Sequence, residues 1–387
     1  MLAAMIRDPD TLNALLDSVR RFVRERLVPA EHEVADTDQI PPAIVAEMKQ
    51  LGLFGLTIPE EHGGLALTME EEALVMFEMG YTSPAFRSVF GTTVGIGAMG
   101  IVIDGTPEQK ALWLPKMATG EVIASFALTE PDAGSDAASL RTTAIRDGDH
   151  YVVNGGKRYI TNAPHASVFT LMARTDPSNK GAGGVSAFIV DAKSPGISLG
   201  KIDKKMGQRG AHTCDVMFDN VRVPAANLIG AEGQGFKTFM TNFNAERLGM
   251  AAQAVGYAQA CLAEALAWAR QRVTFGQPLA ERQVIRHKLV DMARQVDVAR
   301  CLVHDIAWHV QHRAADPAHL VARTALAKVQ ATQAMQFCAD TAVQILGAMG
   351  YMRGTVSERL YREVKVMMIG GGSEEILKDL AGRQWGV

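Results

Sequence analysis

The spacing of apolar residues divides this chain into three stretches of different character. Up to residue 121, apolar positions recur three or four residues apart, the pattern of helices that bury one face. From 122 to 232, short β-branched and aromatic runs alternate with turn residues, and from 233 to 387 the pattern is helical again, in long segments. The chain therefore predicts an α+β protein with an N-terminal helical domain at 1–121, a middle β-barrel or sheet domain at 122–232 and a C-terminal four-helix bundle at 233–387.

Local signals in the first stretch predict where its helices begin and end. An apolar stripe from Leu12 to Leu27 predicts one helix, which we expect to stop at Pro29 because proline cannot continue a helix. Thr68 and Glu71 have the spacing of a capping box at the start of another helix. The run Phe86–Ile103 is apolar on every side, which is typical of a helix buried among other helices.

The middle stretch predicts an antiparallel sheet or barrel, because its strands follow one another without intervening helices. The expected strands are 122–128, 151–154, 158–161, 168–173, 185–190 and 214–218, with Gly155-Gly156 read as a turn between two of them. In the last stretch, long helices are expected at 238–273, 282–313 and 317–346, followed by two shorter ones. Several have more than one apolar face, which indicates that partner subunits cover part of the bundle.

Composition narrows the class of protein. The formal net charge is −3 with scattered basic residues, which argues against a nucleic-acid partner. The four cysteines lie far apart without a CxxC pair, as expected of reduced thiols. The N-terminus lacks the pattern of a signal peptide, and the nearly uncharged run Ser88–Ile103 is too short and glycine-rich for a membrane span. We therefore expect a cytoplasmic protein.

Two patterns suggest chemistry that their surroundings do not support. Gly95, Gly97 and Gly100 form a literal GxGxxG, but the flanking pattern is helical where a dinucleotide fold needs a strand and a βαβ unit. We expect these glycines to permit close helix packing. Histidines at 304, 309 and 312 share one predicted helix, yet no cysteine or carboxylate motif completes a metal site, so no metal is expected.

Four motifs carry a more specific signal. They are LTEPDAGSD at 128–136, NGGKRYITN at 154–162, RVTFG at 272–276 and QILGAMG at 344–350. Alone, the first is a strand followed by a turn. Together, in this order and in these domains, they resemble the signatures of the acyl-CoA dehydrogenase family, with Tyr159 where tryptophan is commoner. The resemblance runs through the whole chain and implies the family's three-domain fold and an FAD cofactor.

The resemblance assigns cofactor contacts to particular residues. Phe126, Leu128 and Thr129 would meet the flavin edge, the Thr161 hydroxyl would lie near flavin N5, and Tyr159 would cover a ring face. Arg272 and Thr274 would hold the FAD pyrophosphate of a neighbouring subunit, and Phe275 would stack near its adenine, which implies a homotetramer. Further FAD contacts fall on Ser135, Gln344, Gly347, Ser373 and Glu375.

The position of the catalytic base departs from the family's commonest pattern. The reaction needs a carboxylate to take the α-proton of the acyl-CoA while flavin N5 accepts the β-hydride. Most members supply it from a Glu-Gly-Thr segment near the C-terminus, but this chain has Gly371 there. Isovaleryl-CoA and long-chain members carry the base in a Glu-Arg pair just after the β domain, which implies Glu246 here. Glu246 pairing with a nearby basic residue is the structural alternative.

The resemblance also implies the substrate contacts. Gly371 would lend its N–H to the thioester oxygen, Arg247 would contact CoA, and Asn244 and Ser135 would lie along the pantetheine path. Arg87 stands in an otherwise apolar helix, so it either pairs with a protein carboxylate or binds an anionic ligand, as an arginine of glutaryl-CoA dehydrogenase binds the distal carboxylate of its substrate.

The leading hypothesis is thus an FAD-dependent acyl-CoA dehydrogenase of fatty acid or amino acid catabolism that passes electrons to an electron-transfer flavoprotein. One alternative is a dicarboxylyl-CoA dehydrogenase, with Arg87 on the distal carboxylate. A second is a repurposed member that catalyses elimination from an acyl-CoA without net oxidation, which Gly371 leaves open. A third is a non-enzymatic helical assembly protein, against which the flavin motifs argue.

Overall fold

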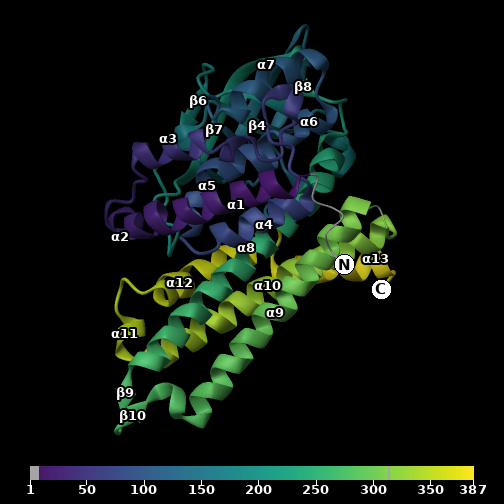
Figure 1. The fold of residues 1–387 in the computed structure, drawn as a ribbon. Coiled ribbons are helices and arrows are strands. Elements are labelled where there is room, and N and C mark those ends of the chain that lie inside the picture. The colour runs from purple at the N-terminus through teal and green to yellow at the C-terminus, as the bar shows by residue number, and fades with distance from the viewer. Residues whose placement is uncertain (1–7, 313) are drawn as a thin grey trace.

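The computed structural model describes residues 8–312 and 314–387. Figure 1 shows the N-terminal helices beside a β-sheet, while the long C-terminal helices extend away from both as a bundle. The predicted fold class is confirmed: a helical N-terminal part, a middle β part and a helical C-terminal part follow one another along the chain. Arg313, the expected end of one long helix, lies outside the described residues.

The capping box predicted at Thr68 and Glu71 is present, but the first helix does not end where the sequence predicts. Asp8 caps the first helix, and Thr68 and Glu71 form the expected capping box. The predicted stop at Pro29 is wrong: a π-helical turn, Val23–Leu27, precedes Pro29, and the chain continues as a helix to Thr37. Proline has no N–H to donate, and the wider π-helical turn before it lets the helix continue without that hydrogen bond. The helices are α1 (Pro9–Phe22), α2 (Val28–Thr37), α3 (Pro42–Gln50), α4 (Met69–Met79), α5 (Pro84–Gly91), α6 (Met99–Asp104) and α7 (Pro107–Ala118).

The apolar run expected as one buried helix is two helices joined by a π-helical turn, Thr92–Gly97. Within the described residues, Pro84–Asp104 is long and apolar enough to cross a membrane by length and composition, and 56% of its most apolar window is buried inside the protein. Its glycines allow the close packing that we expected. A Cβ on Gly97 would lie 2.5 Å from the Cβ of Ala124, and one on Gly100 would lie 2.4 Å from the Phe239 ring.

The middle part forms one sheet in the order β6-β7-β3-β2-β4-β5-β8, with β1 paired to β4. Most pairs are antiparallel, as the sequence predicts, but β1 and β2 run parallel to β4, which the pattern did not indicate. The strands are β1 (Ala124–Ala127), β2 (Thr143–Asp147), β3 (His150–Thr161), β4 (Val168–Arg174), β5 (Val185–Asp191), β6 (Ile197–Leu199), β7 (Thr213–Pro224) and β8 (Leu228–Ile229).

The expected turn at Gly155-Gly156 is instead the middle of one long strand, β3. Its pairing with β7 shifts register on either side of these glycines, so the strand passes through a bulge where the sequence suggested a hairpin. Gly155 has φ +150°, and a Cβ there would lie 2.5 Å from the Thr142 hydroxyl. Bulges bend a strand, and this one precedes the residues that face the site.

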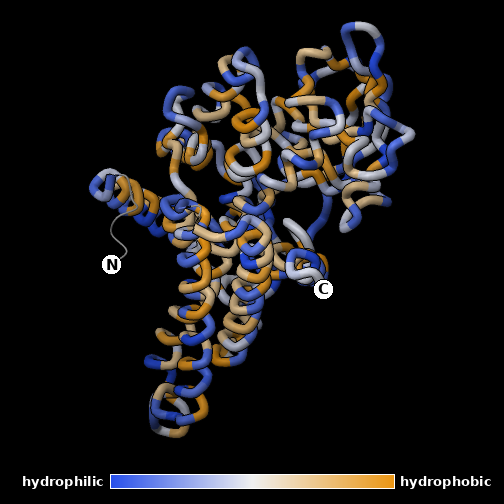
Figure 2. Tube along the Cα trace, turned by 90° about the vertical axis from the view of Figure 1, so that its right-hand side faces the viewer, coloured by the Kyte–Doolittle hydropathy of each residue, from blue (hydrophilic) through white to orange (hydrophobic). Residues whose placement is uncertain are grey.

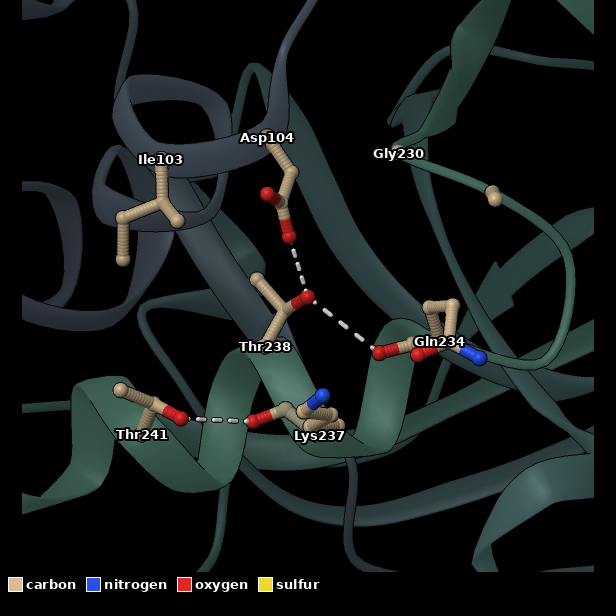
Figure 3. A pocket seen from close by; sticks show the side chains of 8 residues that line it. Ile103, Asp104, Gly230, Gln234, Lys237, Thr238 and Thr241 are labelled. Carbon is tan, nitrogen blue, oxygen red and sulfur yellow. Dashed lines mark hydrogen bonds between the residues drawn. The ribbon is translucent and has the colours of Figure 1, made fainter.

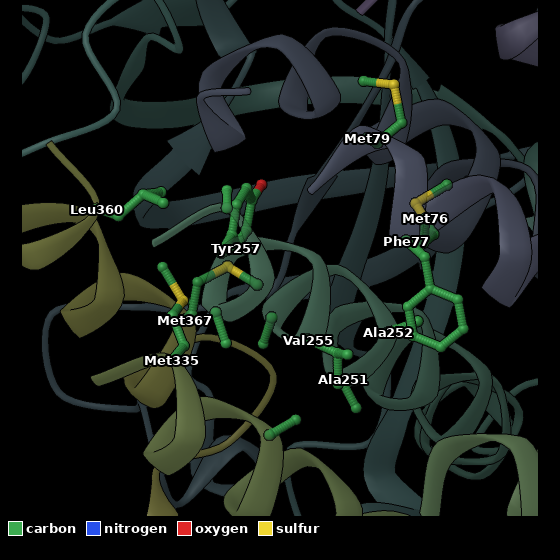
Figure 4. Packing of buried hydrophobic residues seen from close by; sticks show 14 of the residues in the cluster. Met76, Phe77, Met79, Ala251, Ala252, Val255, Tyr257, Met335, Leu360 and Met367 are labelled. Atoms are coloured by element: carbon green, nitrogen blue, oxygen red, sulfur yellow. The ribbon is translucent and has the colours of Figure 1, made fainter. Parts of the chain in front are cut away.

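The C-terminal bundle is built from α8 (Gly235–Gln271), α9 (Gln283–His312) and α10 (Pro317–Leu346), with α11 (Ala348–Tyr351), α12 (Val356–Ile369) and α13 (Glu374–Trp385) after them. A hairpin of β9 (Val273–Thr274) and β10 (Gln277–Pro278) closes its far end (Figure 1). Figure 2 shows hydrophobic and hydrophilic residues alternating along these helices. Figure 4 shows Met76 and Phe77 of α4 in the same buried cluster as Tyr257 of α8 and Met367 of α12, so one core joins the first and last parts of the chain.

Candidate active site

A pocket of about 220 Å³ lies where the sheet, the helical run 84–104, α8 and the loop after α12 meet. It brings together most of the residues that the sequence assigned to the flavin edge, with Gly371 from the C-terminal loop. The lining residues are Thr92, Ile96, Phe126, Leu128, Thr129, Tyr159, Ile160, Thr161, Phe243 and Gly371. Thr92, Ile96, Ile160 and Phe243 were not predicted, because only the fold turns them toward the others.

The end of β3 forms one wall of this pocket through an unusual backbone conformation. Tyr159 and Asn162 both have positive φ, +58° and +61°, and the Tyr159 ring is 58% exposed. The amide of Asn162 donates to the Ser88 carbonyl at 2.6 Å and to the Thr92 hydroxyl at 2.8 Å. These bonds hold the end of the strand against the helical run, and they place Thr161 at the pocket.

The TEPDAGSD loop is built around a buried ion pair. The Glu130 carboxylate accepts from the N–H groups of Arg141 and Thr142, at 2.6 and 2.9 Å, and from Lys157 Nζ at 2.7 Å. Burial raises the pKa of Glu130, but Lys157 and these donors outweigh it and lower the pKa overall. Burial lowers the pKa of Lys157 to about 8. Glu130 therefore shapes the loop, and Ser135 lies exposed on it.

Glu246 of α8 is held by Arg87 of α5 in a two-pronged ion pair. Nη1 and Nη2 of Arg87 donate to Oε1 and Oε2 of Glu246 at 2.7 and 3.0 Å, and the side chains are 13% and 9% exposed. Gly95 leaves room for this carboxylate, because a Cβ there would lie 2.1 Å from Glu246 Oε2. Of the two roles weighed for Arg87, the structure shows pairing with a protein carboxylate, and the partner is the predicted base.

A second carboxylate adds to this charge cluster. Glu72 of α4 is buried, and burial together with the neighbouring charge of Glu246 raises its pKa to about 7, although Arg87 acts in the opposite direction. Arg87 thus carries the positive charge between two buried carboxylates. No local pattern in the sequence points to Glu72.

The loop between α12 and α13 closes the pocket from the C-terminal side. Gly371 and Gly372 have φ of +69° and +110°, and Gly371 lines the pocket. Arg247 donates from Nε to the Gly371 carbonyl at 2.9 Å and from Nη1 to Asn244 Oδ1 at 3.2 Å. Burial lowers the pKa of Arg247 to about 10. Asn244, Arg247 and Gly371, all expected at the substrate, are therefore neighbours.

The remaining predicted cofactor contacts lie outside this pocket. Arg272, Thr274 and Phe275 belong to the hairpin region at the far end of the bundle (Figure 1), where the Phe275 ring is 96% exposed beneath the Arg282 guanidinium. Gln344 and Gly347 are exposed at the end of α10. Ser373 caps α13 and Glu375 is exposed in its first turn. One subunit does not bring these residues to its own pocket.

A larger pocket of about 410 Å³ lies between α6 and the start of α8 (Figure 3). The Thr238 hydroxyl donates to Asp104 there, and Lys237 and Gln234 also line the pocket. It contains none of the predicted site residues. The motif residues gather at the smaller pocket.

Family models match the three parts of the chain in order. The acyl-CoA dehydrogenase N-terminal domain matches residues 9–121, the middle domain 125–221 and the C-terminal domain 233–386. The chain belongs to the acyl-CoA dehydrogenase family. It is accordingly an oxidoreductase acting on CH–CH donors, of a family whose members are FAD-dependent flavoproteins.

Individual relatives agree with this assignment over nearly the whole length. An acyl-CoA dehydrogenase of Bacillus subtilis (strain 168) is 40% identical over 365 residues, covering 92% of this chain and 93% of its own. The butyryl-CoA dehydrogenase structure from Megasphaera elsdenii superposes with a TM-score of 0.93 at 33% identity, covering 98% and 99% of the two chains. A glutaryl-CoA dehydrogenase in complex with glutaryl-CoA superposes with a TM-score of 0.91 at 33% identity, covering 98% and 96%.

The pocket residues fit the flavin of such an enzyme. A flavin ring is flat and apolar with a polar edge, and the pocket offers the exposed Tyr159 ring beside Phe126 and Leu128. The hydroxyls of Thr129 and Thr161 make no hydrogen bond to any residue that the structure describes, so they are available to the polar edge. These residues would hold the ring, and its chemistry would be hydride acceptance.

Proposed function

We propose that this enzyme removes the α-proton and β-hydride of an acyl-CoA thioester to give the 2-enoyl-CoA, with Glu246 as the base. The observation that carries the proposal is the position of Glu246. Its carboxylate abuts Gly95, next to the pocket residue Ile96, and lies one helical turn after the pocket residue Phe243. Gly371, where most family members carry the base, has no side chain to compete for the proton.

Arg87 supports this role by pairing with the buried carboxylate. An unpaired carboxylate with 9% exposure would be costly in its charged form, and the guanidinium offsets that cost. The ion pair uses one lone pair on each oxygen, so each retains another that can accept a proton. Bound FAD supplies the hydride acceptor. The N–H of Gly371 would stabilise the negative charge that develops on the thioester oxygen when Glu246 takes the proton.

A dicarboxylyl-CoA substrate is the second candidate, and one feature of Arg87 favours it. Its Nε is buried and has no partner among the described residues. A distal carboxylate on the acyl chain would use this donor and share the positive charge with Glu246. The superposed glutaryl-CoA dehydrogenase carries a substrate of this class. Non-oxidative elimination from an acyl-CoA remains the third possibility, for which Glu246 would still be the base.

We further propose that Arg272, Thr274 and Phe275 bind the FAD of a neighbouring subunit in a homotetramer, and that electrons leave to an electron-transfer flavoprotein in the cytoplasm. The exposure of Phe275 at the far end of the bundle supports the first point, because an apolar ring at 96% exposure is available to a ligand or a neighbouring subunit. The domain boundaries 1–121, 122–232 and 233–387 belong to the same proposal.

Anaerobic mixing with butyryl-, isovaleryl- and glutaryl-CoA tests the reaction. Dehydrogenation bleaches the flavin, whereas elimination releases product without bleaching it. The preferred thioester then reports whether the acyl chain carries a distal carboxylate.

The base is tested by exchange of the α-proton for deuterium. Glu246→Gln should retain FAD and lose exchange by roughly 10²- to 10⁴-fold, the range for removal of a general base. Glu264→Gln is a matched control on the same helix, since Glu264 only accepts hydrogen bonds from Val356 and Ser357 at the start of α12. Normal exchange by the Glu246 variant would rule out this base.

A further inference from the structure

The loop Gly370–Gly372 reaches the pocket at Gly371, which lines it. Neither the N–H of Gly371 nor that of Gly372 donates to a protein acceptor in the part of the chain that the structure describes. Both residues have positive φ, which glycine adopts as readily as negative φ, so their own conformational preference does not fix the loop. Contacts from other elements have to hold it in place.

Two buried cations hold the loop by its carbonyl groups. Lys328 of α10 donates from Nζ to the carbonyls of Met368 and Gly372, at 3.0 and 2.9 Å. Arg247 donates to the intervening Gly371 carbonyl. Because C=O and N–H point in opposite directions across a trans peptide, the bond from Arg247 turns the Gly372 N–H away from that side chain.

Burying the Lys328 ammonium costs free energy that two hydrogen bonds to carbonyls do not explain. Its residue is 0% exposed, and no carboxylate lies within ion-pair distance of Nζ among the residues described. Burial of the ammonium, together with the nearby charge of Arg247, lowers the pKa of Lys328 to about 8. A buried ammonium without a counter-ion destabilises a fold, so its position against this one loop points to a role in the site.

We propose that Lys328 is a positioning residue for the reaction, which holds the Gly370–Gly372 loop so that its N–H groups meet the thioester oxygen. This inference rests on the proposed function and deepens it. Lys328 acts through the loop, because its bonds to the Met368 and Gly372 carbonyls tie both ends of the loop to α10. Arg247 fixes the peptide between Gly371 and Gly372 by its carbonyl, so the loop is preorganised for the charge that develops during proton removal.

The test compares a thioester with an analogue that lacks its carbonyl oxygen. Lys328→Met keeps the length of the side chain and removes the donors. In the holoenzyme, α-proton exchange should fall about 10- to 100-fold for whichever panel thioester the wild type exchanges fastest. The Kd of the matching S-alkyl-CoA thioether should stay within about threefold, because a thioether makes no use of the N–H groups. Lys328→Gln can still donate to one carbonyl and should recover part of the rate.

Thr332→Val is the matched control. Thr332 lies one turn further along α10, is equally buried, and its hydroxyl bonds only to carbonyls of its own helix. The Thr332→Val enzyme should exchange the α-proton at the wild-type rate. If Lys328→Met does not fold, Lys328→Gln carries the same comparison.

Three results would overturn the inference. If Lys328→Met exchanges the α-proton as fast as the wild type, this inference is overturned and the proposed function is not. A loss of thioether affinity as large as the loss of exchange rate also overturns it, because the lysine would then only support the fold. A wild-type enzyme that exchanges none of the panel thioesters overturns the proposed function, and this inference with it.

Discussion

Arg87 binds both carboxylate oxygens of Glu246, at 2.7 and 3.0 Å, across 159 residues of sequence. Fork-to-fork pairs of this kind fix the geometry of a carboxylate as well as its charge. The base of the proposed reaction is therefore held by the N-terminal helices, although it belongs to the C-terminal bundle.

Removing one partner of this pair should destabilise the protein more than removing both. Arg87→Met leaves Glu246 buried and unpaired, which costs about 3–5 kcal/mol in comparable pairs. The double variant Arg87→Met/Glu246→Gln has no buried charge left over from the pair. Urea unfolding of both singles and the double should give a non-additive coupling of about 0.5–3 kcal/mol. Strictly additive free energies would show that the pair contributes nothing through its contact.

Gly95→Ala should impair catalysis through the position of the base. The added Cβ would lie 2.1 Å from Glu246 Oε2, so the carboxylate has to move. We expect α-proton exchange to fall about 10- to 100-fold, because small displacements of a catalytic group have effects of that size. Gly382→Ala is the control, since a Cβ at this helical glycine meets its nearest atom at 3.6 Å. Equal rates for the two variants would contradict the proposed place of Glu246.

Glu72 should give stability a characteristic dependence on pH. Its pKa in the folded protein is raised to about 7 from an ordinary value of 4.5, so between these values the folded state binds more protons than the unfolded one. Its contribution to stability is complete below pH 4.5 and is lost as the pH rises through 7. A glutamine at this position does not titrate, so Glu72→Gln should not lose stability in this way as the pH rises.

The measurement is the Tm of wild type and Glu72→Gln at pH 5 and pH 8. The Tm of the variant, relative to that of the wild type, should be higher at pH 8 than at pH 5. A difference in Tm that does not change with pH would show that Glu72 ionises normally in the folded protein.

Phe275→Ala should weaken FAD binding if this ring stacks on an adenine. Base–aromatic stacking contributes about 1–3 kcal/mol, so the Kd for FAD should rise at least about 5-fold. The fold should be unaffected, because the ring is 96% exposed. Met206→Ala, at a residue that is 64% exposed on the β part, controls for loss of exposed apolar surface. Unchanged FAD affinity would show that Phe275 does not contact the cofactor.

Local chemistry made part of this fold predictable. The capping box at Thr68 and the helix Pro317–Leu346 came out as expected, because each depends on residues next to one another in sequence. The helix end at Pro29 and the turn at Gly155 were wrong for the opposite reason. A preceding π-helical turn and the pairing of β3 with β7 decide those positions, and neither has a short-range signal.

The same distinction applies to the site. Leu128, Thr129, Tyr159 and Thr161 lie in motifs, and the structure gathers them at one pocket. The partner of Arg87 could not be predicted, because it depends on how α5 meets α8. Lys328 reads in sequence as one more polar residue of a helix, and only its burial against the loop after α12 distinguishes it.

The glycine loop also bears on how this enzyme could have diverged from relatives that carry the base at its position. A glutamate at 371 would now have to adopt φ +69°, which costs a side chain about 1–2 kcal/mol, and its Cβ would lie 3.0 Å from Met250 Sδ. A single reversion therefore yields a strained intermediate. With the base at Glu246, as proposed, a return to position 371 requires changes both in this loop and on α8, where Met250 lies.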